Sequence, residues 1–107
     1  MENRLRAILL RGIEDFIFDL PLDDQDKIFG AIEALRDRKF DSVYIKQLKG
    51  SIKELRIRKY RLLCFIHEEV IYFERIFIKK TNKTPRNEIG MAEKYYKLIM
   101  NKKYENN

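Results

Sequence analysis

The sequence has one cysteine, one histidine, two prolines and no tryptophan among its 107 residues. The lone Cys64 has no partner for an intrachain disulfide, which favours a reducing, intracellular environment. It is expected to fill a strand as a small apolar residue, because no surrounding motif supports a nucleophile. Cys64 and the single His67 are too few for a usual zinc site. We therefore expect neither a metal nor a small-molecule cofactor.

Long hydrophobic runs are also missing. The longest apolar stretches are much shorter than the roughly 20 residues that span a bilayer, and the first ten residues hold no extended apolar block of signal-peptide type. A cytoplasmic protein without membrane contact is expected. The length predicts one domain, residues 1–107, with a single modest core.

Positive charge is concentrated in one part of the chain. The formal net charge is +6, but residues 1–45 contain 10 acidic and 7 basic side chains, whereas residues 46–86 contain 12 basic and 4 acidic ones. A basic block is often just a solvated surface. A block of this density also attracts polyanions, with a strong dependence on salt, so partners rich in phosphate are expected.

The hydrophobic pattern predicts an α+β fold. A short strand at 5–10 is followed by two helices in tandem, one at 13–20 that ends at Pro21 and one with acidic residues at its start and an apolar stripe through Leu35. Extended, alternating segments follow at 44–48, 52–58, 61–67 and 70–79. Their short connections predict an antiparallel meander. A last helix is predicted from Thr84 as N-cap and Pro85 as first helical residue, with fraying from Asn101.

Cations recur inside these strands. Alternation places Arg56 and Arg58 on the face opposite Leu55. Arg61 begins a strand that is apolar on both faces, so it needs a carboxylate or a phosphate as partner, and Glu54 is a candidate. We predict that Arg56, Arg58 and Arg61 converge with Lys79 or Lys80 on a concave sheet surface. The alternative for each is a solvent-facing charge that keeps the sheet soluble.

The ordered motifs of this region are similar to those of a known family. They are LKG at 48–50, ELR at 54–56, YR at 60–61, FIKKT at 77–81, KTP at 83–85 and EI at 88–89. In this order they resemble the HigB-type toxins of the bacterial RelE/ParE superfamily, over roughly residues 13–100. The individual elements are weak evidence, whereas the ordered set is specific.

The resemblance implies a RelE/ParE-like sheet, with an N-terminal helical hairpin and a C-terminal helix, and a ribosome-dependent endoribonuclease that cleaves mRNA. It also implies a cognate helix-turn-helix antitoxin of HigA type. The catalytic residues that we predict are Arg56, Arg61, Lys79 and Lys80. Further contacts to RNA are predicted for Lys49, Arg58, Lys83 and Arg86, with Glu54 as a structural partner of the arginines.

These residue types suit attack of a ribose 2′-OH on the neighbouring phosphate. Guanidinium groups such as Arg56 and Arg61 bind two phosphate oxygens at once, and Lys79 or Lys80 can move the proton. The sequence does not decide between the two lysines. His67 beside a predicted turn is a minor candidate. Tyr60, on the side opposite Arg61, is expected to pack rather than to stack on a base.

Two other functions are compatible with the sequence. A ParE-like toxin would inhibit DNA gyrase without cutting RNA, and its sheet cations would be dispensable. A simple RNA-binding module would associate with RNA in a salt-sensitive way but would cleave nothing.

Overall fold

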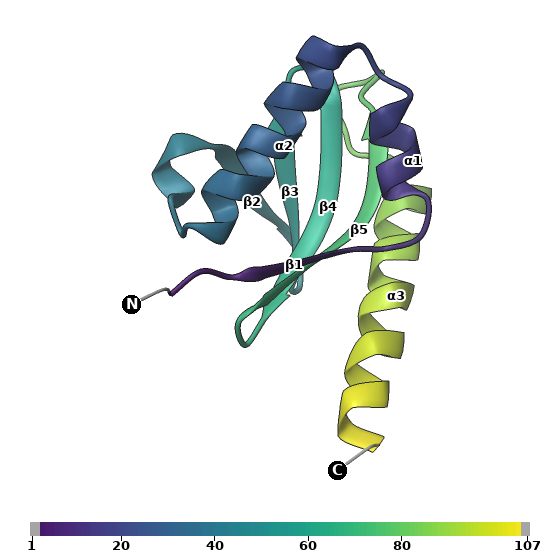
Figure 1. The fold of residues 1–107 in the computed structure, drawn as a ribbon. Helices are drawn as coiled ribbons and strands as arrows, with labels where there is room; N and C mark the ends of the chain where they lie inside the picture. Colours follow the sequence, from purple (N-terminus) through teal and green to yellow (C-terminus); the bar gives the residue numbers. More distant parts are fainter. Residues whose placement is uncertain (1–2, 106–107) are drawn as a thin grey trace.

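The computed structural model describes residues 3–105 (Figure 1). In chain order the elements are β1 (Arg6–Leu9), α1 (Ile13–Phe18), α2 (Leu22–Arg36), the short 3-10 helix η1 (Phe40–Ser42), β2 (Tyr44–Lys49), β3 (Ile52–Ile57), β4 (Tyr60–His67), β5 (Val70–Ile78) and α3 (Arg86–Glu105). The expected α+β architecture is confirmed, including the helical hairpin and the terminal helix. No helix within residues 3–105 combines the length and apolar character that a membrane crossing requires.

The five strands form one sheet in the order β1-β5-β4-β3-β2. Strands β2 to β5 are the predicted antiparallel meander. The sequence did not indicate that β1 pairs in parallel with β5, where Arg6 lies opposite Val70 and Leu9 opposite Phe73. The N-terminal strand thereby covers part of the edge that the last strand would otherwise expose.

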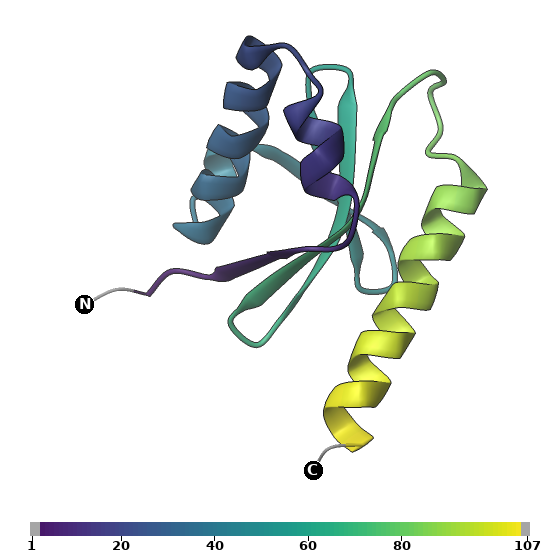
Figure 2. The ribbon, with the colours of Figure 1, turned by 45° about the vertical axis from the view of Figure 1, so that its right-hand side comes forward.

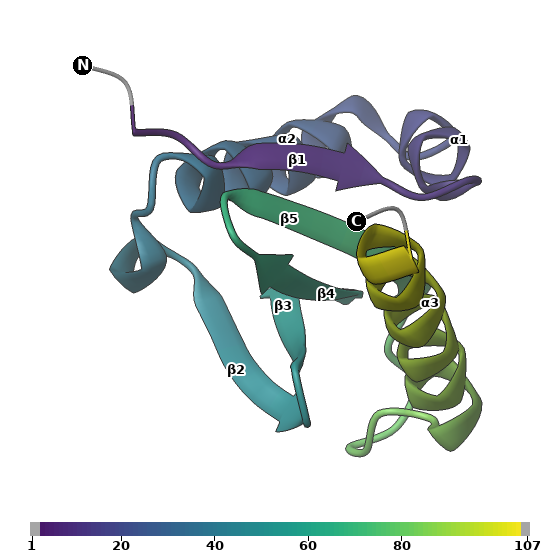
Figure 3. The ribbon, with the colours of Figure 1, turned by 90° about the horizontal axis from the view of Figure 1, so that it is seen from below.

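Helices cover both faces of the sheet (Figures 2 and 3). On one face α1 and α2 pack against a core that includes Ile28, Leu55, Leu62 and Phe73. On the other face α3 packs beside β4 and β5 over a smaller cluster that includes Phe65. Figure 3 shows that the start of β2 lies away from α3 on this second face. We call this face, which carries α3 over only part of its width, the α3 face.

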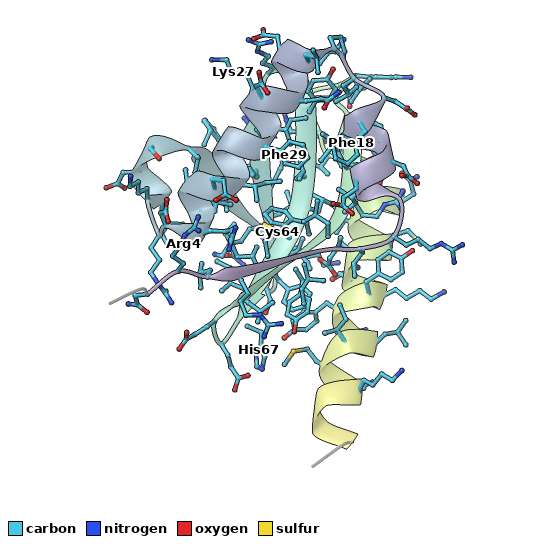
Figure 4. The ribbon with its side chains drawn as sticks, in the orientation of Figure 1. Arg4, Phe18, Lys27, Phe29, Cys64 and His67 are labelled. Atoms are coloured by element: carbon cyan, nitrogen blue, oxygen red, sulfur yellow. The ribbon has the colours of Figure 1, made fainter. Side chains whose placement is uncertain are left out.

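The helical hairpin is closed by aromatic packing and tied to the sheet. The rings of Phe18 in α1 and Phe29 in α2 are 5.7 Å apart between centroids (Figure 4). On the sheet side, the hydroxyl of Tyr60 donates a hydrogen bond of 2.6 Å to Asp24 in the first turn of α2. Tyr60 is 1% exposed and meets Phe16 edge-on, so the expected packing role is confirmed.

The turn between β3 and β4 differs from the prediction by one residue. Strand β3 ends at Ile57, which lies opposite Tyr60, so the connection is Arg58-Lys59 rather than Lys59-Tyr60. Arg58 adopts a left-handed conformation with φ 54°, which two-residue hairpin turns require. Arg58 therefore leaves the strand, and its side chain no longer follows the alternation that places Arg56.

The last helix also differs from the prediction at both ends. It begins at Arg86, and the carbonyl of Pro85 accepts hydrogen bonds from the backbone N–H groups of Glu88 and Ile89. Thr84 does not cap the helix with its hydroxyl, which bonds to Glu54 instead. The helix continues to Glu105, although fraying was expected from Asn101. Residues 106 and 107 lie outside the described chain.

Candidate functional site

A row of four side chains crosses the sheet on the α3 face. Tyr44 of β2 lies opposite Arg56 of β3, Arg56 lies opposite Arg61 of β4, and Arg61 lies opposite Phe77 of β5. Residues directly opposite each other in antiparallel strands project from the same face, with Cβ atoms about 5 Å apart. The register therefore brings Arg56 and Arg61 together, as the sequence predicted. We call these four residues the transverse row.

Arg56 is held from two sides. Its Nε donates a 3.0 Å hydrogen bond to Oε1 of Glu54, two residues earlier on the same face of β3. Its guanidinium carbon lies 4.6 Å from the centroid of the Tyr44 ring, a cation–π contact. These two contacts fix the direction of the Arg56 side chain, which is 23% exposed and therefore still reaches solvent.

Arg61 is nearly buried, with 8% of its surface exposed. Its Nη1 donates to the backbone carbonyls of Arg58 and Tyr60, at 2.9 and 2.8 Å. Its Nε is buried without a hydrogen-bond partner, and no carboxylate of residues 3–105 forms an ion pair with it. The positive charge of Arg61 is therefore not balanced by a carboxylate, and an anion beside its exposed part would be favoured.

Glu54 is a structural partner, but of Arg56 rather than of Arg61. The carboxylate is 2% exposed and receives hydrogen bonds from Arg56 and from the hydroxyl of Thr84. Burial by itself would raise the pKa of Glu54, but the hydrogen bonds from Thr84 and Arg56 outweigh it and hold that pKa below its ordinary value. Glu54 thus stays ionised, and it fixes Arg56 and the loop of Thr84 together.

The lysines of the FIKKT and KTP motifs lie around the end of β5. The backbone N–H of Lys79 donates to the carbonyl of Lys59, so the ladder continues past Ile78 and alternation assigns Lys79 to the face of Phe77. The exposed Lys83 directly precedes Thr84, whose contact with Glu54 brings this part of the loop to β3.

Lys80 and Arg86 lie further out. Lys80 lines a surface pocket beside the outer edge of β5, together with Phe16 of α1 and Asn87 of α3. Arg86 is exposed at the first position of α3. The cations after β5 therefore surround the end of this strand, and alternation places Lys79 in line with the arginines.

Two of the predicted cations do not join Arg56 and Arg61. The guanidinium of Arg58 lies 2.7 Å from carboxylate oxygens of both Asp23 and Asp24 at the start of α2, on the side of the helical hairpin. Lys49 lies at the far end of β2 from Tyr44, roughly 17 Å along the strand, and approaches Glu93 of α3 at 3.6 Å.

The remaining candidates stay outside the site. His67 lies at the β4–β5 hairpin, the opposite end of β4 from Arg61 (Figure 4). Cys64 is buried in the sheet, and burial, with a smaller contribution from Glu74, raises the pKa of its thiol to about 12, which removes it as a nucleophile. Residues 3–105 offer no group of three or more metal-ligating side chains.

The sequence interpretation missed two residues of this site. Tyr44 was taken only as the start of a strand, and its position beside Arg56 follows from the register of β2 with β3. Thr84 was interpreted as a helix cap because threonine before proline commonly has that role. A short loop that returns to β3 carries no comparable local signal. Tyr44 contacts Arg56 directly and Thr84 acts through Glu54, so both help to hold Arg56 beside Arg61. Two adjacent guanidinium groups can bind a phosphate.

Comparisons with known proteins agree with this architecture. The family model described as phage derived protein Gp49-like (DUF891) matches residues 15–97. Among solved structures, the chain is similar to the toxin–antitoxin complex RelBE2 from Mycobacterium tuberculosis, with a TM-score of 0.56 and 14% sequence identity. The similarity covers 71% of this chain and 99% of the matched one. At this identity it shows a shared fold. A search of curated proteins found no match.

Proposed function

Because this chain belongs to the Gp49-like family of phage-derived proteins and has the fold of a RelE-type toxin, we propose that it is the toxin of a type II toxin–antitoxin system. Its activity in this proposal is that of an endoribonuclease of HigB type, which cleaves mRNA on the ribosome in the cytoplasm and thereby stops translation. Its partners are the ribosome, mRNA and a cognate helix-turn-helix antitoxin of HigA type. The similarity to a chain of a toxin–antitoxin complex supports an antitoxin partner.

The observation that carries the proposal is the state of Arg61. This arginine is almost buried, has an Nε without a partner, and lies opposite Arg56 in the adjacent strand. Of these two neighbouring guanidinium groups only Arg56 is paired with a carboxylate, that of Glu54, so the pair favours an anionic ligand. A phosphodiester presents two oxygens at the spacing that a guanidinium fork recognises.

In the proposed reaction the 2′-oxygen of one ribose attacks the adjacent phosphorus, its proton leaves, and the bond to the 5′-oxygen of the next nucleotide breaks. Arg56 and Arg61 bind the non-bridging oxygens, whose negative charge grows as the fifth bond to phosphorus forms. A lysine supplies a proton to the departing 5′-oxygen or accepts the one from the 2′-OH. By position in the fold, Lys79 is the better candidate for this transfer, and Lys80 and Lys83 attract the flanking backbone.

The direct test is to replace Arg61 by Gln and, separately, by Lys. Because Arg61 supports the β3–β4 turn through two carbonyl contacts, thermal unfolding must accompany each assay. Loss of one charge-stabilising donor should lower cleavage of ribosome-bound mRNA about 100-fold or more in Arg61→Gln, and Arg61→Lys should retain part of it. Arg6→Gln on β1 is the matched control, since Arg6 is exposed and lies opposite Val70, at the far end of β5 from Phe77.

The readouts are growth after induction and the positions of new transcript ends. Wild-type rates in folded Arg61→Gln would remove the proposed site. Growth arrest without new RNA ends would contradict the nuclease and favour a gyrase inhibitor. RNA association without cleavage in the presence of ribosomes would leave only a binding module.

A further inference from the structure

Tyr44 is an exposed aromatic residue in an unusual position. Its side chain is 57% exposed at the start of β2, the edge strand of the sheet. The other large apolar side chains that are exposed among the described residues include Phe18, Leu22 and Leu98, which lie on helices outside the transverse row. Tyr44, by contrast, lies opposite Arg56 and ends the row that contains both arginines of the proposed phosphate site.

The ring has one face occupied and much of its remaining surface open. Arg56 covers one face, with its guanidinium carbon 4.6 Å from the ring centroid. The same guanidinium donates its Nε to Glu54 and keeps its other nitrogens for a ligand. Adjacent strands are about 5 Å apart, so β2, which carries the ring, lies roughly 5 Å from the strand of Arg56 and 10 Å from that of Arg61.

Phe77, at the other end of the transverse row, does not present an open ring in this way. It packs against the buried cluster under α3 and lines the pocket beside Lys80. The two aromatic ends of the row therefore differ: Phe77 belongs to the packing of the sheet, and Tyr44 presents its ring to solvent next to a cation.

We propose that Tyr44 is a base-stacking subsite for single-stranded RNA. In this proposal, which rests on the proposed function, an unpaired base beside the scissile phosphate stacks on the open side of the Tyr44 ring while Arg56 and Arg61 hold the phosphate. Aromatic side chains on sheets bind splayed bases in this way, and every base offers a π-face. The subsite therefore adds affinity and orientation for the nucleotide and does not select one base by its hydrogen-bonding edge.

A purely structural role for Tyr44 makes a different prediction. If the ring served only to orient Arg56, its removal would weaken cleavage of every substrate by the same factor, whether or not a base is present. If the ring stacks on a base, removal of either one abolishes the same contact, so removal of the second causes no further loss of cleavage rate. A double-mutant cycle between protein and RNA separates the two roles.

The experiment measures kcat/KM for cleavage of ribosome-bound mRNA by the full chain. The substrates are an intact mRNA and a series in which one nucleotide near the cleaved phosphate at a time is abasic. The proteins are the wild type, Tyr44→Ala, Tyr44→Phe and the control Phe18→Ala. Phe18 is 58% exposed, close to the value for Tyr44, and lies on α1 away from the transverse row. Thermal unfolding checks that each variant is folded.

We expect Tyr44→Ala to lower cleavage of intact mRNA roughly 5-fold or more, because stacking on one aromatic side chain is typically worth at least this factor. Tyr44→Phe keeps the stacking ring and should recover most of the rate that Tyr44→Ala loses, whereas Phe18→Ala should stay within about 2-fold of wild type. For the wild type, loss of the base at one position should lower the rate by a similar factor relative to intact mRNA. For Tyr44→Ala, the same abasic substrate should be cleaved at the same rate as intact mRNA.

Either of two results would overturn the stacking subsite while leaving the nuclease in place. One is a wild-type rate in Tyr44→Ala. The other is an equal loss in Tyr44→Ala on intact mRNA and on every abasic substrate. If the wild-type protein cleaved none of the substrates, the proposed function itself would fail, and the subsite with it.

Discussion

The hydroxyl of Thr84 donates a hydrogen bond to Oε2 of Glu54, which joins the loop after β5 to β3 across the intervening strand β4. The other oxygen of the same buried carboxylate accepts the Nε of Arg56. One side chain thus fixes both an arginine of the proposed phosphate site and the loop that carries Lys83. This contact couples the conformation of the loop to the direction of Arg56.

The first prediction concerns this contact. Thr84→Val keeps the shape of the side chain but removes the donor, so Glu54 keeps only Arg56 as a partner. Loss of one hydrogen bond to a buried carboxylate should lower the free energy of unfolding by about 1 to 3 kcal/mol, measured by urea denaturation at pH 7. Thr81→Val, in the same loop and exposed, is the control and should change stability much less.

The same variant should be more sensitive to acid. The pKa of Glu54 is depressed in the folded state, so ionised Glu54 stabilises the fold above its unfolded pKa and this stability is lost as the pH falls through the folded value. Without Thr84 the folded pKa rises, and unfolding on acidification should begin at a higher pH than in the wild type. Identical acid transitions in the two proteins would contradict this role of the contact.

The second prediction concerns Glu74, the extra residue of β5 where the register with β4 shifts. Its carboxylate is 2% exposed with no hydrogen-bond partner on either oxygen, and burial raises its pKa from 4.5 to about 8. The folded state therefore retains the proton that the unfolded state has released. This contribution to stability is complete below pH 4.5 and is lost progressively as the pH rises to about 8.

Glu74→Gln should remove this loss, because the amide cannot ionise. We expect the thermal midpoint of the wild type to fall between pH 5 and pH 8 and that of Glu74→Gln to fall less over the same interval. Scanning calorimetry in buffers of equal ionic strength would measure the difference. If the thermal midpoints of both proteins declined in parallel, Glu74 would be ionised in the folded protein, with a partner for its charge.

The third prediction separates the arginines by their place in the fold. The affinity for a single-stranded RNA oligonucleotide should depend on salt, and each phosphate contact contributes about 0.7 to the slope of log affinity against log salt. Arg56→Gln should reduce this slope by about that amount. Arg58→Gln should leave it unchanged, because Arg58 is engaged by Asp23 and Asp24 on the side of the helical hairpin.

Fluorescence anisotropy at several salt concentrations would provide these slopes. Arg58→Gln also loses the ion pairs to α2, so it should lower the thermal midpoint while preserving RNA affinity. An equal loss of slope in both variants would place Arg58 on the RNA path after all, and would require its release from the two aspartates on binding.

Much of the fold could be predicted because its signals are local. The alternation of apolar residues located β2 to β5, and the short connections between them made the antiparallel meander the expected topology. The apolar stripe of α2, which includes Ile28 and Ile32, and the break at Pro21 located the helical hairpin. The parallel pairing of β1 with β5 could not be predicted, because nothing in a four-residue strand specifies which edge it joins.

The site was predicted in part. Arg56 and Arg61 meet as expected, since both follow the alternation of regular strands. Arg58 was expected beside them, but a turn placed one residue earlier turns its side chain to the acidic start of α2. A shift of one residue in a strand exchanges its two faces, so a small error in the turn has a large effect on a side chain at its end.

The sequence by itself determined the chemical groups available and, within regular stretches of strand, the side on which they lie, because side-chain direction there follows the two-residue period of the backbone. That period placed Arg61 and Tyr60 on opposite faces, as the structure has them. Only the tertiary structure decided which groups meet. Strand register and loop closure determine that Glu54 pairs with Arg56 and Thr84 and that Tyr44 lies beside the arginines. Both depend on many weak contacts between segments that are distant in the chain.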